Sequence, residues 1–340
     1  MFFRRLVVTV DSHTQGEPTR LVIGGIIHYP GQTMREKQAY VAREYDPIRK
    51  ALMGEPRGHR DMFGGYITPP ATESGDLGII YMDNSGYLDM CGHGTIGLCT
   101  AVVELGLVQP HPPRTEIQID TPAGRVTGYA LSTNGQVTRA GFRNVPSFCL
   151  SPSECIEVEG IGRLEVGIAY GGNFFAIVPA TAAGVALTLD NMAQLRQVGM
   201  KIKHAANTQL TVQHPTIPEV SGIDIVTFYG LSDNPKARYK NVHIFANGQV
   251  DRSPGGTGTS GMLAYLIARG KLQPEETVVA EGLAGGLFEG CMAESWQEEE
   301  MIYYTPDISG TAYLTGIHQF SLDLEYPTLE RLRPSEIANL

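Results

Sequence analysis

The stretch Cys91-Gly92-His93-Gly94-Thr95-Ile96-Gly97 indicates how this chain is organised, because it has a near copy 164 residues further along. The copy reads Gly255-Gly256-Thr257-Gly258-Thr259-Ser260-Gly261, and four of its seven positions carry the same residue as the first stretch. Two matched glycine-rich turns predict two matched half-domains with a shared site between them. The two copies differ at their first position, where the reactive thiol of Cys91 has only the hydrogen of Gly255 as its counterpart.

Each glycine-rich turn leads into an apolar segment, residues 95–105 in the first copy and residues 259–269 in the second. Both segments are apolar nearly all round, which is typical of a helix enclosed by protein. Gly106 and Gly270 follow them directly, at the position where a left-handed helix cap is expected. We therefore predict one buried central helix, wrapped by strands, in each half of the chain.

The rest of the chain predicts more strands than helices. Its 40 glycines and 21 prolines divide it into short segments rich in Val, Ile, Tyr and Thr, a pattern typical of strands separated by turns. Strands are predicted at residues 6–10, 21–27, 77–82, 116–119, 136–142, 164–170, 174–178, 224–228, 242–245 and 312–317. Two further helices are predicted at residues 35–53 and 188–204. This mixture indicates an α+β fold and not a regular alternation of strand and helix.

The predicted architecture has two pseudo-symmetric lobes, each a curved sheet or barrel around its central helix. A length of 340 residues suits two domains of ordinary size. We expect residues 1–150 to form a first lobe that carries Cys91. Residues 151–311 are expected to form a second lobe that carries the Gly255 turn, with the boundary in the polar stretch near its beginning.

The composition excludes several classes of function. The chain is 42% hydrophobic and 18% charged, with a formal net charge of -10, and this negative excess argues against a nucleic-acid partner. Apolar runs stay well below the ~18 residues that cross a membrane, and the first residues lack the apolar segment of a secretory signal. Five cysteines without a metal-type pair indicate free thiols in a reducing compartment. We therefore expect a cytoplasmic protein that does not act on membranes.

Both glycine-rich turns match the pattern G-x-G-x-x-G, so a dinucleotide-binding site must be considered. Its confirming strand–helix–strand context is missing, because prolines 110, 112 and 113 interrupt the region after the first turn. Two matches in register indicate a duplication instead. Glycines let backbone N–H groups approach an anion closely, and a helix start adds partial positive charge. Two facing helix starts are therefore suited to binding a small carboxylate.

The residues around the two turns supply the candidate chemistry. Cys91 stands where a helix start favours the reactive thiolate form, whereas the other four cysteines (99, 149, 155 and 291) are interpreted as structural. His93 lies between two glycines and is interpreted as a substrate contact in preference to a packing residue. Asp251 is interpreted as a ligand for an ammonium group, with an ion pair to Arg252 as the alternative. The histidines show no metal-ligand spacing, so we expect no metal site.

Several motifs of this chain resemble those of the proline racemase family. The matching stretches follow the family's order along nearly the whole chain, at residues 11–20, 55–62, 68–70, 90–95, 169–174, 251–259 and 316–320. The family includes proline racemase, 4-hydroxyproline 2-epimerase and trans-3-hydroxy-L-proline dehydratase. The resemblance implies the two-lobed fold of diaminopimelate epimerase, no cofactor, a small imino acid as substrate and a homodimer. It also implies that residues 312–340 pack back onto the first lobe.

The resemblance implies a role for each residue of the two turns. Cys91 matches the family's first acid/base cysteine, and His93 and Asp251 match its contacts to the substrate amine. The backbone N–H groups that would cradle the carboxylate belong to Gly92, His93, Gly256 and Thr257. Gly94 and Gly255 complete the substrate-binding turns.

The chain departs from the family at Gly255. Racemase and epimerase members carry a second cysteine there, and the dehydratases usually carry threonine, so glycine matches neither pattern. A smaller departure is Asn247, where relatives often have aspartate.

A glycine at this position bears on the reaction. Inversion at the α-carbon without a cofactor needs one proton-transfer group on each face of the substrate, whereas β-elimination needs only one base. The sequence therefore predicts a trans-3-hydroxy-L-proline dehydratase in which Cys91 removes the α-proton and only backbone faces the substrate from the Gly255 side. The alternatives are a racemase or epimerase that uses water or another side chain as its second acid, and an inactive carboxylate-binding homologue.

Overall fold

The computed structural model describes residues 5–322 of the chain. Its helices are α1 (Met34–Glu44), α2 (Asp46–Met53), α3 (Gly92–Glu104), α4 (Met192–Gln209) and α5 (Gly256–Ala268), with a 3₁₀ turn at Leu189–Asn191. Within residues 5–322, every helix is too short or too polar to cross a membrane.

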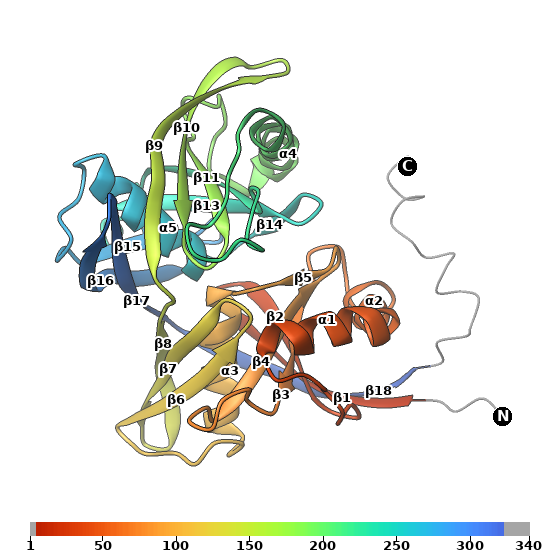
Figure 1. The fold of residues 1–340 in the computed structure, drawn as a ribbon. Helices are drawn as coiled ribbons and strands as arrows, with labels where there is room; N and C mark the ends of the chain where they lie inside the picture. Colours follow the sequence, from red (N-terminus) through yellow and green to blue (C-terminus); the bar gives the residue numbers. More distant parts are fainter. Residues whose placement is uncertain (1–4, 323–340) are drawn as a thin grey trace.

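The strands fall into two groups in space (Figure 1). The lower body in that view holds α1–α3 together with β1 (Arg5–Thr14), β2 (Glu17–Gly24), β3 (Phe63–Thr68), β4 (Leu77–Asp83), β5 (Tyr87–Leu88), β6 (Arg114–Thr121), β7 (Gly124–Thr133), β8 (Gln136–Arg143) and β18 (Ala312–Leu322). The upper body holds α4 and α5 together with β9 (Ser147–Val158), β10 (Gly162–Tyr170), β11 (Phe174–Pro179), β12 (Ile225–Leu231), β13 (Tyr239–Phe245), β14 (Gln249–Asp251), β15 (Val278–Glu281), β16 (Leu287–Glu298) and β17 (Met301–Gly310).

Pairing between strands far apart in sequence ties the two bodies together. The last described strand, β18, pairs antiparallel with β1, so the end of the described chain lies beside its beginning. Strand β17 pairs with both β8 and β9, on either side of the short break at residues 144–146. The division of the chain near residue 150 stays a prediction, and residues 323–340 of the proposed returning segment lie outside the described residues.

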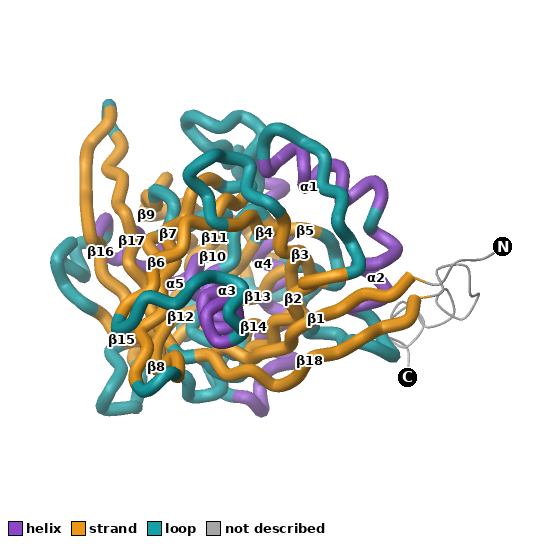
Figure 2. The backbone as a smooth tube through the Cα atoms, turned by 90° about the horizontal axis from the view of Figure 1, so that it is seen from below, coloured by secondary structure: helices purple, strands orange, loops and turns teal. Residues whose placement is uncertain are grey.

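Each body encloses one apolar helix, which confirms the predicted α+β architecture. Helix α3 packs against β1, β7, β8 and β18, and helix α5 packs against β9, β10, β16 and β17. Every residue from Gly92 to Val103 is buried, as is every residue from Gly256 to Leu266. Figure 2 shows α3 nearly end-on among the surrounding strands. The burial of both helices on all sides explains why neither carries a polar face.

The structure differs from the sequence prediction at several helix boundaries. The helix predicted at residues 35–53 is two helices, because α1 ends at Glu44 and a new helix starts with Pro47 in its first turn. Proline lacks the N–H group that would continue a helix, but a first turn does not need that group. The predicted glycine-rich turns are themselves the first turns of α3 and α5. The helix predicted at 188–204 begins at Met192 and extends to Gln209.

Some strands were missed by the sequence prediction. These are β3, β5, β7, β9, β14, β15, β16 and β17. In β16 the residues from 293 to 298 are all exposed, so this part of the strand lacks the alternation of apolar and polar residues that marks a half-buried strand.

Candidate active site

The first turns of α3 and α5 meet at the centre of the molecule. A Cβ atom added to Gly92 would lie 2.2 Å from the Cα atom of Gly256, and one added to Gly256 would lie 2.6 Å from the Cα atom of Gly92. Only glycine permits this approach, since real Cβ atoms do not come so close to another backbone. The first N–H groups of a helix have no carbonyl partner within the helix. Two sets of such donors therefore lie side by side, with the positive ends of two helix dipoles.

Cys91 is the N-cap residue of α3 and lies at this junction. Its backbone is extended, with φ of -146° and ψ of 124°. The Sγ atom accepts a hydrogen bond from the backbone N–H of Gly94 at 3.3 Å, and it lies 3.3 Å from Nδ1 of His93. The side chain is buried. A sulfur that accepts a helix-start N–H and lies beside an imidazole has the surroundings typical of a reactive cysteine.

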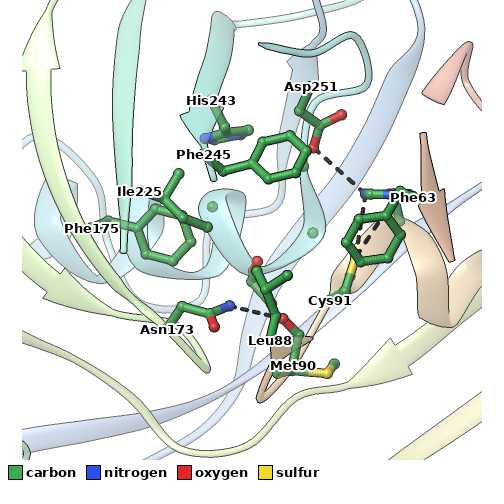
Figure 3. Close-up of a pocket in the computed structure, with 16 residues that line it drawn as sticks. Phe63, Leu88, Met90, Cys91, Asn173, Phe175, Ile225, His243, Phe245 and Asp251 are labelled. Carbon is green, nitrogen blue, oxygen red and sulfur yellow. Dashed lines mark hydrogen bonds and ion pairs between the residues drawn. The ribbon is translucent and has the colours of Figure 1, made fainter. Parts of the chain in front are cut away.

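His93 contacts both Cys91 and Asp251, two residues that Figure 3 labels. Its Nδ1 atom is 3.7 Å from Oδ2 of Asp251, and both side chains are buried. Burial alone lowers the pKa of His93, but the negative charges of Cys91 and Asp251 outweigh burial and raise this pKa well above its usual value. Burial likewise raises the pKa of Asp251, but the nearby His93 outweighs that effect and lowers it. Both directions favour a protonated His93 imidazole beside an ionised Asp251 carboxylate.

Asp251 is held by its own loop, and a second carboxyl group, that of Glu17, is close enough to feel its charge. Its Oδ1 atom accepts hydrogen bonds from the N–H of Ser253 at 2.9 Å and from the Ser253 hydroxyl at 2.7 Å. Glu17 is fully buried behind it and accepts two hydrogen bonds from Arg252. Burial and the neighbouring Asp251 charge raise the pKa of Glu17 to about 8. Arg252 is thus bound to Glu17, and not to Asp251 as the alternative interpretation supposed.

A side chain is present on the Gly255 side of the site. The sequence prediction that only backbone faces the substrate from that side is therefore wrong. A Cβ atom added to Gly255 would lie 2.2 Å from Cδ2 and 2.4 Å from Nε2 of His243. The imidazole of His243 therefore fills the space that a side chain at position 255 would occupy. Gly255 also has a φ of 65°, in the left-handed region that favours glycine. Both observations explain why this position accepts no larger residue in the present arrangement.

One pocket brings together most of the residues predicted from sequence. Cys91, Gly92, His93, Asp251, Gly255, Gly256 and Thr257 all line it, whereas Gly94 lies outside the lining and acts through its N–H group on Cys91. Sequence reasoning missed nine lining residues: Phe63, Leu88, Met90, Asn173, Phe175, Ile225, His243, Phe245 and Gly258. Asn173 belongs to one of the family-like motifs, and its side chain donates to the carbonyl of Met90 at 2.8 Å. The local sequence gives no signal for His243, because its place in the pocket follows from the pairing of β13 with β14.

The pocket walls combine an apolar side with a polar side. Aromatic and aliphatic side chains approach from several strands, as Figure 3 shows for Phe63, Phe175 and Ile225. The polar groups are the thiol, the imidazole and the carboxylate described above, with the two helix starts beneath them. Such a pocket fits a small molecule that carries a carboxylate, an ammonium group and an apolar ring.

The fold and this site define a class of enzyme with two lobes, each built around a buried helix, and a cysteine at the meeting point of the two helix starts. Comparison with known proteins gives the family. The family model for proline racemase matches residues 9–330. This chain belongs to the proline racemase family.

Individual relatives differ in the reactions that their names describe. A proline racemase from Clostridioides difficile is 42% identical over 96% of this chain and 98% of its own length. A trans-3-hydroxy-L-proline dehydratase from Bacillus cereus is 38% identical over 94% of this chain and 95% of its own length. A hydroxyproline epimerase from Agrobacterium vitis, solved with bound trans-4-hydroxy-L-proline, is 29% identical, with a TM-score of 0.89 over 96% of this chain and 95% of its own. The protein is thus an enzyme of a family with isomerase and dehydratase members.

Proposed function

We propose that this enzyme is a cofactor-independent dehydratase that converts trans-3-hydroxy-L-proline into 1-pyrroline-2-carboxylate and water. The observation that carries the proposal is the chemical difference between the two helix starts, a thiol at Cys91 and no side chain at Gly255. Inversion of the α-carbon needs a proton-transfer group on each face of the ring, and elimination needs only one. A homodimer and a cytoplasmic location stay predictions.

The contacts of the pocket suggest how the substrate binds. The carboxylate would accept hydrogen bonds from the first N–H groups of α3 and α5, at Gly92, His93, Gly256 and Thr257. The ring ammonium group would lie near the Asp251 carboxylate, which is buried and held by Ser253. Negative charge that develops on the carboxylate during proton removal would be stabilised by the same N–H groups.

The stereochemistry of the substrate favours a site with one reactive side. In trans-3-hydroxy-L-proline the hydroxyl and the carboxylate lie on opposite ring faces, so the α-hydrogen and the 3-hydroxyl share a face. The group that takes the α-proton and the group that protonates the leaving hydroxyl must then lie together. Cys91 and His93 do, with 3.3 Å between Sγ and Nδ1.

The proposed reaction balances without a further reactant. The Cys91 thiolate takes the α-proton, and the electron pair of that C–H bond becomes the C2–C3 double bond as the C3–O bond breaks. His93, which is protonated, gives a proton to the departing hydroxyl, and water leaves. The enamine that remains becomes 1-pyrroline-2-carboxylate when a proton moves from nitrogen to C3. The thiol then returns its proton to His93, and the site is restored.

The second candidate is a racemase or epimerase, which is supported by the 42% identity to a proline racemase and by the imidazole of His243 beside Gly255.

The two candidates are separated by product analysis. Incubation with trans-3-hydroxy-L-proline should yield a pyrroline that reacts with o-aminobenzaldehyde, and Cys91→Ser should abolish it, whereas Cys155→Ser, at an exposed cysteine, should not. Formation of D-proline from L-proline, together with no pyrroline from trans-3-hydroxy-L-proline, would establish the second candidate. Binding of pyrrole-2-carboxylate without turnover of either substrate would indicate an inactive homologue.

A further inference from the structure

The internal repeat identifies the position at which this site is incomplete. Cys91 and Gly255 are equivalent residues, since each is the N-cap of its own central helix. Two such caps would present two side chains to a ligand bound between the helix starts. This chain presents the Cys91 thiol from one cap, and the space at the other cap is filled from a different strand.

His243 fills that space, with its ring against the first turn of α5. Its ring is 2.2 Å from a Cβ atom placed on Gly255 and 2.1 Å from one placed on Gly258. The residue comes from β13, in register with Asp251 of β14, and it is buried to 3% exposure. Phe175 packs edge-on against the imidazole, with 6.0 Å between ring centroids. The ring is therefore held from several sides while it lines the pocket.

Both nitrogens of this ring have partners within the protein. Nε2 lies 2.7 Å from the carbonyl oxygen of Pro254, which can only accept, so Nε2 carries the proton. Nδ1 lies 2.8 Å from the Thr227 hydroxyl and accepts from it. Burial lowers the pKa of His243, which keeps the ring neutral. In this state the imidazole has neither a free lone pair to take a proton from substrate nor a free N–H group to give one.

We propose that His243 is the specificity-determining residue of this enzyme, because its imidazole occupies the second acid/base position and closes that face of the substrate to proton transfer. The inference rests on the proposed elimination and adds a reason for its outcome. A carbanion at the α-carbon that meets a donor on its far face is protonated with inversion. When that face is sealed by a ring without a free donor, and water is kept out, loss of the 3-hydroxyl is the remaining forward step.

The test uses L-proline, which has no hydroxyl to lose, in D₂O. Wild-type enzyme should exchange the α-hydrogen for deuterium with retention of configuration, because only Cys91 reaches the α-carbon. In the double variant His243→Ala, Gly255→Cys the ring no longer fills the space at position 255, so a second thiol fits there once the left-handed φ of that residue relaxes. This variant should form D-proline at a rate at least about a hundredfold above wild type. Chiral chromatography with mass detection measures both quantities. His214→Gln is the matched control, since His214 is buried outside this pocket, and it should behave as wild type.

A second variant keeps the inference testable if the double variant does not fold, which near-ultraviolet circular dichroism would reveal. His243→Ala alone admits water beside Gly255 and should form D-proline at least about tenfold faster than wild type. Wild-type racemisation that is lost in His243→Ala would overturn the inference, since His243 would then be a proton donor. Folded variants that form no D-proline would overturn it as well. Neither result alters whether wild type makes pyrroline from trans-3-hydroxy-L-proline, so the proposed function is judged separately.

Discussion

Gly92 and Gly256 touch backbone to backbone, with 2.2 Å between the Cα atom of Gly256 and the place where a Cβ atom of Gly92 would lie. This contact sets the distance between the two helix starts, and with it the spacing of the N–H groups that we propose bind the substrate carboxylate.

Gly256→Ala should therefore damage both stability and activity. The added methyl group meets the backbone of Gly92 and the ring of Phe142 at 2.8 Å, and overpacking of this kind costs roughly 1–3 kcal/mol of unfolding free energy. Displacement of the cradle should lower kcat/KM about a hundredfold or more. Urea unfolding and initial rates measure the two effects. Gly86→Ala, where the added methyl group meets nothing within 4 Å, is the control, and equal behaviour of the two variants would contradict the contact.

Cys91→Ala should remove the base and leave the fold intact. The Sγ atom accepts only from the Gly94 N–H and faces His93, so its loss should lower kcat by a factor of about 10²–10⁴ with little change in melting temperature. The exposed Cys155, changed to alanine, provides the comparison. Residual activity close to wild type would show that another group takes the α-proton.

Asp251→Asn should shift the pH dependence of the reaction. Cys91 and Asp251 together hold the pKa of His93 above its usual value against the effect of burial. Without the Asp251 charge this pKa falls, so His93 loses its proton at a lower pH, and the decline of kcat/KM on the alkaline side should begin at a lower pH than in wild type. A pH–rate profile of both enzymes measures the shift. Asp233→Asn, at an exposed carboxyl, should leave the pH–rate profile unchanged. An unchanged profile in Asp251→Asn would show that His93 does not protonate the departing hydroxyl.

Glu17→Gln should make stability less dependent on pH. The folded protein raises the pKa of Glu17 from 4.5 to about 8, so the folded state keeps a proton that the unfolded chain has lost. The contribution of Glu17 to stability is fully present below about pH 4.5 and is lost as the pH rises towards 8. Unfolding by urea at pH 5, 7 and 8.5 should show a decline in wild type that is smaller in Glu17→Gln. The exposed Glu294, changed to glutamine, should keep the wild-type slope. A slope shared by all three proteins would place the cause elsewhere.

The sequence predicted those parts of the fold that have a local signal. Residues 95–105 and 259–269 are apolar nearly all round, and the helices α3 and α5 that they belong to are buried on all sides. The break between α1 and α2 was missed because its signal is one proline, Pro47, inside an otherwise helical stretch. Strands such as β16 were missed because a run of exposed residues, 293–298, interrupts the alternation of buried and exposed positions.

The candidate site shows the same limit. Cys91, His93 and Asp251 could be predicted because they flank the repeated turns. The repeat predicts that the two helix starts face each other, but the closeness of Gly92 to Gly256 depends on how the two helices dock. His243 is harder still, since its place beside Gly255 follows from the register of β13 against β14. The sequence around His243 does not indicate that its ring contacts the first turn of α5.

We propose that proton transfer in this enzyme takes place on one face of the substrate ring only. The decisive measurement is the ¹H NMR spectrum of trans-3-hydroxy-L-proline incubated with the enzyme in D₂O. We expect the α-proton signal to disappear as signals of the pyrroline product rise, without formation of cis-3-hydroxy-D-proline. Accumulation of cis-3-hydroxy-D-proline, the epimer at the α-carbon, would show that protons are also delivered to the opposite face.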